Sequence, residues 1–72
     1  MEQFNLQKAI AGAQVCTRNG NPAVIKAVRN SNFCFPVVCE VLTDENRWRE
    51  IRYKYDGHEF GHGESPNDLF MR

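Results

Sequence analysis

The sequence predicts a small, mainly β domain in which one short helix precedes about five antiparallel strands. Three observations lead to this prediction. The chain has 72 residues, which is enough for one domain. Short polar turns such as Asn19-Gly20 and Asp56-Gly57 separate its apolar, β-branched runs. The longest run, residues 33–42, is followed by a polar turn and then by alternating charged and aromatic residues, which is typical of a long β-hairpin.

A helix is expected over residues 6–11. Asn5 would cap its first turn, and Gly12 would end it by supplying a left-handed backbone. Two helical turns are not stable alone in water, so the helix must pack on the sheet. Its apolar face would comprise Phe4, Leu6, Ala9 and Ile10.

The first predicted hairpin joins residues 15–17 to residues 23–29 through Asn19-Gly20. Asn-Gly favours a type I′ turn, because both central residues of that turn need positive φ. The second strand carries apolar side chains on both faces, with Val24 and Val28 on one and Ile25 and Ala27 on the other. It is therefore predicted to be central in the sheet.

The second predicted hairpin pairs residues 33–42 with the strand Arg47–Tyr55. Pro36 has no amide hydrogen and would bend the first strand. Trp48 is out of phase with Ile51, which leaves two alternatives: a bulge near Arg49, or a Trp48 side chain that points away from the core. One face of the first strand would be wholly apolar, comprising Phe33, Phe35, Val37, Cys39 and Val41.

The chain would end with a short strand over residues 58–60 and a helical turn that Ser65 caps, with Leu69 and Phe70 packed on the core. Consecutive hairpins favour an antiparallel meander, and the bend at Pro36 favours curling into an SH3-like partial barrel. The alternative is an open sheet of about four or five strands with the helix across one face.

Composition narrows the functional classes. Nine Lys/Arg balance nine Asp/Glu, which argues against a general polyanion binder, since such domains are usually basic. No apolar run is long enough to span a membrane, and Glu2 stands where a signal peptide carries positive charge. Cys16, Cys34 and Cys39 form no Cys-x-x-Cys pair, which favours thiols in a reducing compartment. We expect a cytoplasmic protein without a cofactor.

The candidate binding surface lies on the charged strand and comprises Arg47, Trp48, Arg49, Arg52 and Lys54. Its cations could neutralise phosphates, and its aromatic rings could stack on unpaired bases. The alternative is a solvated strand face, because acidic residues lie close by and would pair with the cations. These are Glu40, Asp44, Glu45 and Glu50.

Metal binding and catalysis have less support. His58 and His62 lie close to two carboxylates, but this glycine-broken run matches no standard ligand spacing for zinc. A nucleophilic cysteine needs a lowered pKa and a nearby base, whereas the cysteines here lie in apolar or strand-like runs. We expect no metal site and no enzymatic activity.

The segments FNLQKAIAGAQVCTRNGNPAVI and YKYDGHEFGHGESPNDLFM resemble a family of short uncharacterised bacterial and phage-type proteins. The matching positions are Phe4, Asn5, Leu6, Gly12, Val15, Thr17, Arg18, Gly20, Tyr55, Asp56, Gly57, Ser65, Asp68, Leu69 and Met71. The resemblance implies a small domain of unassigned function and transfers no active-site residue.

The chain is therefore expected to be a non-enzymatic interaction module that binds another protein or a second copy of itself. Its small size, balanced charge and exposed sheet edges motivate this expectation. The alternative is a weak nucleic-acid-binding module that uses the Arg47–Tyr55 strand. The salt dependence of binding would distinguish protein binding from nucleic-acid binding, because phosphate contacts release counterions.

Overall fold

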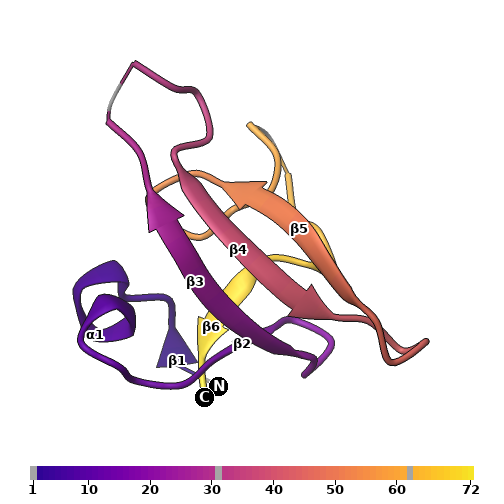
Figure 1. The fold of residues 1–72 in the computed structure, drawn as a ribbon. Coiled ribbons are helices and arrows are strands. Elements are labelled where there is room, and N and C mark those ends of the chain that lie inside the picture. Colours follow the sequence, from indigo (N-terminus) through magenta and orange to yellow (C-terminus); the bar gives the residue numbers. More distant parts are fainter. Residues whose placement is uncertain (1, 31, 62) are drawn as a thin grey trace.

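The computed structural model describes residues 2–30, 32–61 and 63–72, and within them six strands form one antiparallel sheet (Figure 1). The elements are β1 (Glu2–Gln3), α1 (Leu6–Ile10), β2 (Val15–Thr17), β3 (Pro22–Val28), β4 (Val37–Leu42), β5 (Trp48–Tyr53) and β6 (Leu69–Met71). The strand order is β1-β6-β2-β3-β4-β5. The predicted mainly antiparallel β fold with a short N-terminal helix is confirmed, and the sheet curls without closing into a barrel.

The meander from β2 to β5 follows the chain, but β6 does not continue it. After β5 the chain crosses back so that β6 lies between β1 and β2 (Figure 1). Leu69 pairs with Thr17, and Phe70 pairs with both Cys16 and Gln3. The predicted packing of Leu69 is confirmed, since only 3% of it is exposed. It lies in a strand, however, and not in a helical turn.

The core lies on one face of the sheet. The cross-strand pairs Val37–Tyr53 and Cys39–Ile51 place four side chains on that face, and all four are buried. Burying such apolar area is the main favourable term in folding. The core comprises Ala9, Val15, Ala23, Val37, Cys39, Val41, Ile51, Tyr53, Leu69 and Met71.

Helix α1 begins as predicted. The side chain of Asn5 accepts a hydrogen bond of 3.1 Å from the Lys8 amide, and Gly12 has a φ of 108°. Ala9 is buried in the core, but Ile10 is 60% exposed, so its predicted place on the apolar face is wrong. Adjacent helical residues point about 100° apart, so a helix that packs through Ala9 turns Ile10 towards solvent.

One loop geometry recurs in the described chain, over residues 17–21, 43–47 and 54–58. In each, the first amide bonds the fifth carbonyl, at 2.8, 2.8 and 3.0 Å, and the fourth amide bonds the first carbonyl, at 2.8, 2.9 and 3.0 Å. The fourth residue has positive φ: 87° at Gly20, 62° at Asn46 and 89° at Gly57. This is the pattern of a three-residue loop with a left-handed last residue. The predicted type I′ turn at Asn19-Gly20 is therefore wrong.

Strand β4 begins later than predicted. The Arg29 amide bonds the Pro36 carbonyl at 2.7 Å, but Pro36 has no amide hydrogen to return, so the ladder ends there. The residues before Pro36 lie in bends, and Phe33 is 46% exposed. The predicted apolar face is confirmed for Val37, Cys39 and Val41, and it is wrong for Phe33.

The register of the strand pairs shows how side chains are directed along β3 and where Trp48 of β5 points. β3 is central as predicted, but its pairing with β4 shifts between Ile25 and Ala27, which breaks the simple alternation along the strand. β5 pairs with β4 without a shift from Tyr53 to Trp48. Trp48 therefore points away from the core, and it is 51% exposed.

We predict that Gly57→Ala destabilises the fold more than Gly20→Ala. Both residues have positive φ, where a Cβ costs about 1–2 kcal/mol. A Cβ on Gly57 would also lie 2.9 Å from the Phe4 side chain, whereas a Cβ on Gly20 would have no heavy atom within 4 Å. The free energy of unfolding, measured in urea for each variant, should fall further for Gly57→Ala. Equal losses would show that the contact with Phe4 costs nothing.

Candidate functional site

The five residues of the predicted binding surface do not share one face of the sheet. Arg49 lies opposite Val41 on the core side of β5, whereas Trp48 and Arg52 lie on the other side, opposite Leu42 and Val38. The other two predicted residues lie outside β5: Arg47 is in the turn before the strand, and Lys54 directly follows it.

Acidic side chains lie beside several of these cations. Glu50 is 3.6 Å from Arg52, and Asp56 is 3.8 Å from Lys54. Glu40 faces Glu50 across the ladder and pairs with Lys26 at 3.4 Å. Positive and negative charges therefore alternate on the outer face, as the solvated-face alternative expects.

β5 is the last strand of the described sheet, so one side of its backbone has no strand partner. The Thr43 amide bonds the Arg47 carbonyl at 2.8 Å, which fixes which residues of β5 bond to β4. Backbone groups alternate in direction along an antiparallel strand. The amide and carbonyl groups of Trp48, Glu50 and Arg52 consequently point outwards from the sheet.

A groove of about 520 Å³ follows this open edge. One wall comes from residues 33–35 before β4, and another from Glu59 and Phe60 after β5. Phe33 and Phe60 are 46% and 51% exposed. The guanidinium of Arg29 lies 5.5 Å from the centre of the Phe33 ring. We refer to β5 together with Phe33, Phe35 and Phe60 as the β5 edge.

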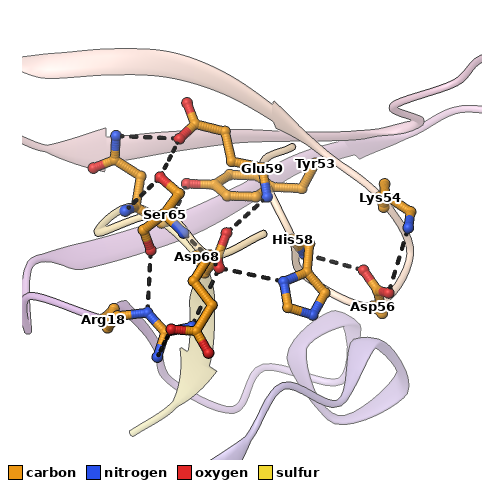
Figure 2. A network of polar contacts seen from close by, with 10 residues as sticks. Arg18, Tyr53, Lys54, Asp56, His58, Glu59, Ser65 and Asp68 are labelled. Atoms are coloured by element: carbon orange, nitrogen blue, oxygen red, sulfur yellow. Dashed lines mark hydrogen bonds and ion pairs between the residues drawn. The ribbon is translucent and has the colours of Figure 1, made fainter. Parts of the chain in front are cut away.

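A polar cluster centred on Asp68 holds the segment between β5 and β6 (Figure 2). Asp68 is 2% exposed. It accepts hydrogen bonds from the Ser65 amide at 3.0 Å, the Glu59 amide at 2.9 Å and Arg18 Nη2 at 3.2 Å, and His58 Nδ1 lies 3.2 Å away. Burial alone would raise the pKa of Asp68, but these hydrogen bonds outweigh it and hold the pKa below its ordinary value.

The same cluster ties three segments together. Arg18, which follows β2, also donates to the Ser65 carbonyl at 3.1 Å, and its own amide bonds the Asp68 carbonyl at 2.8 Å. Because the Glu59 amide is used by Asp68, the predicted strand over residues 58–60 does not form. Sequence reasoning did not single out this cluster, although the Ser-x-x-Asp spacing from Ser65 to Asp68 was its visible signal.

Ser65 is held inside this cluster by its own hydrogen bonds. Ser65 is 1% exposed, and its hydroxyl donates to Glu59 Oε1 at 2.5 Å. His58 faces Asp68, and its Nδ1 lies 3.2 Å from an Asp68 carboxylate oxygen (Figure 2). A nucleophilic serine needs access to substrate, whereas the Ser65 side chain is buried.

Metal binding and a nucleophilic cysteine are the other chemistry that the sequence raises. Among the described residues, no group of three or more His, Cys, Asp or Glu is placed to hold a metal ion. His62 lies outside the described residues. Burial raises the pKa of the Cys39 thiol to about 12. No helix in the described ranges is both long and apolar enough to cross a membrane.

Comparison with known proteins gives the family. The family model described as Haemophilus phage HP1 protein YO09 matches residues 1–69 of the chain. The chain belongs to this family. The resemblance to small phage-type proteins is thereby confirmed, and the YO09 match includes the whole Asp68 cluster. No curated protein and no solved structure matches the chain.

We predict that Asp68→Asn lowers the free energy of unfolding by about 3 kcal/mol, because it leaves Arg18 and two amides without a charged acceptor. Asp56→Asn is the matched control. Asp56 also accepts from a loop amide, that of His58 at 3.1 Å, but it is exposed, so its loss should cost under about 1 kcal/mol. Urea unfolding at neutral pH measures both. Similar losses would contradict an anchoring role for Asp68.

Acid should destabilise the fold through the same residue. The pKa of Asp68 is lower in the folded chain than its ordinary 3.8. Its contribution is therefore fully present above the unfolded pKa and is lost as pH falls through the folded pKa. Unfolding free energies measured from pH 6 down to about pH 2 should fall less steeply for Asp68→Asn than for the wild type. Parallel curves would mean that Asp68 does not carry this dependence.

Proposed function

We propose that the chain is a non-enzymatic interaction module that binds another protein by adding an extended segment to the β5 edge. The observation that carries the proposal is an open strand lying in a groove with exposed aromatic side chains. In strand addition, main-chain hydrogen bonds supply affinity, and alternate side chains supply specificity. Trp48, Glu50 and Arg52 would supply the main-chain groups.

The contrast with the opposite edge supports this proposal. Natural sheets protect edge strands by keeping them short, by bulges, by proline or by covering them. At the far edge, β1 has only two residues. β5 has six residues, contains no proline and pairs with β4 without a bulge. The strand that the groove follows is thus neither short nor bulged and has no proline, and charged side chains are its remaining protection.

Nucleic-acid binding by Arg47, Trp48, Arg49, Arg52 and Lys54 stays the alternative proposal. The 51% exposure of Trp48 would allow a base to stack on it. Glu50 lies between Trp48 and Arg52 on the same face, however, and would repel a phosphate chain. A cytoplasmic location and an SH3-like partial barrel also stay proposals, and the free thiols of Cys34 and Cys39 support the first of them.

We predict that peptides selected for binding will occupy the β5 edge. A random display library of peptides about eight residues long is screened against the purified chain, and binders are mapped by NMR. The amides of Trp48, Glu50 and Arg52 should shift and exchange more slowly with solvent. Glu50→Pro removes one outward amide without breaking the β4 ladder, so affinity should fall about tenfold.

Asp44→Pro is the matched control, because proline is favoured at the second position of a turn and Asp44 lies there, remote from the groove. Selected peptides that shift other surfaces, or that bind Glu50→Pro unchanged, would refute strand addition at β5. A single-stranded oligonucleotide that shifts the β5 amides, with affinity falling steeply as salt rises, would support the alternative.

A further inference from the structure

We infer that the partner of the β5 edge is a second copy of the chain, bound with the two β5 strands antiparallel about a two-fold axis beside Ile51. This inference rests on the proposed function and names its partner. A two-fold interface uses the same surface on both copies, so the β5 sequence must complement itself when it is reversed.

The backbone permits few symmetric registers. Where the two strands overlap, an outward-pointing residue of one copy must bond an outward-pointing residue of the other. Because Trp48, Glu50 and Arg52 point outwards, the two-fold axis can lie beside residue 48, 49, 50, 51 or 52, and the residue beside the axis faces its own counterpart.

Strand overlap and charge together select one of these registers. An axis beside Trp48 would overlap the two β5 strands at that residue alone, because β5 begins there. Axes beside Arg49, Glu50 or Arg52 place like charges directly opposite each other, which destabilises a strand pair. With the axis beside Ile51, an apolar residue faces itself, and Glu50 of each copy faces Arg52 of the other. Each cross-strand pair of opposite charges stabilises the ladder, and symmetry produces the pair twice.

The surrounding geometry fits the same register. Glu50 and Arg52 already lie 3.6 Å apart within one copy, so pairing would create a square of four alternating charges. Both side chains are more than half exposed, at 58% and 53%, and therefore accessible.

The contact is small, because it rests on one strand and the groove beside it. Interfaces of this kind lie at the weak end of specific association. We therefore expect a monomer–dimer equilibrium that is visible at chain concentrations up to about 1 mM, and not a permanent dimer.

Reversing single charges provides the test. Glu50→Arg and Arg52→Glu each create like-charge pairs, so each variant alone should dimerise at least tenfold more weakly than the wild type in sedimentation equilibrium. An equimolar mixture of the two variants restores opposite charges at every position and should associate again as a heterodimer. The double variant E50R/R52E should regain homodimerisation. Circular dichroism checks that each variant is folded.

A wild type that stays monomeric at 1 mM, or a mixture of the two variants that fails to associate, would overturn the inference. In either case, selected peptides that still bind at β5 would leave the proposed function standing with a different partner. A dimer that persists in Glu50→Pro and in both charge variants would use another surface, which would also overturn the inference.

Discussion

The buried carboxylate of Asp68 is the constraint on which the rest of this structure depends. It gathers the amides of Ser65 and Glu59 and the side chain of Arg18, so it fixes the return of the chain from β5 to β6. A carboxylate this deeply buried is tolerated only when its oxygens are well hydrogen-bonded. Removing any donor therefore affects both the β2–β6 contact and the loop after β5.

This anchoring also has a consequence for the surface. The Glu59 amide would be available to extend the sheet past β5, but it bonds Asp68 instead. Glu59 and Phe60 consequently form a wall of the groove and not part of a seventh strand. The interaction that stabilises the fold thus leaves β5 at the edge of the described sheet, which is the feature that the proposed function uses.

The open edge combines features that protect it with features that favour binding. Charged side chains on the outer face keep the monomer hydrated, and they disfavour most accidental strand pairings because like charges would meet. The same alternation of Glu50 and Arg52 becomes complementary in one reversed register. An edge of this kind can be selective without a deep pocket, since the backbone supplies affinity and the charge order supplies the register.

The sequence alone determined the features that depend on near neighbours in the chain: the Asn5 cap, the positions of the hairpins β2–β3 and β4–β5, and the buried alternation of Val37, Cys39 and Val41. Within the candidate site, it predicted that β5 is charged and half-exposed and offered both directions for Trp48. Only the tertiary structure decided that Phe33 is exposed, that Leu69–Met71 is a strand and that Asp68 is an anchor. The reason is that these features depend on residues far apart in the sequence. The Arg18–Asp68 hydrogen bond, for example, joins residues 50 positions apart, and no local pattern encodes such a contact.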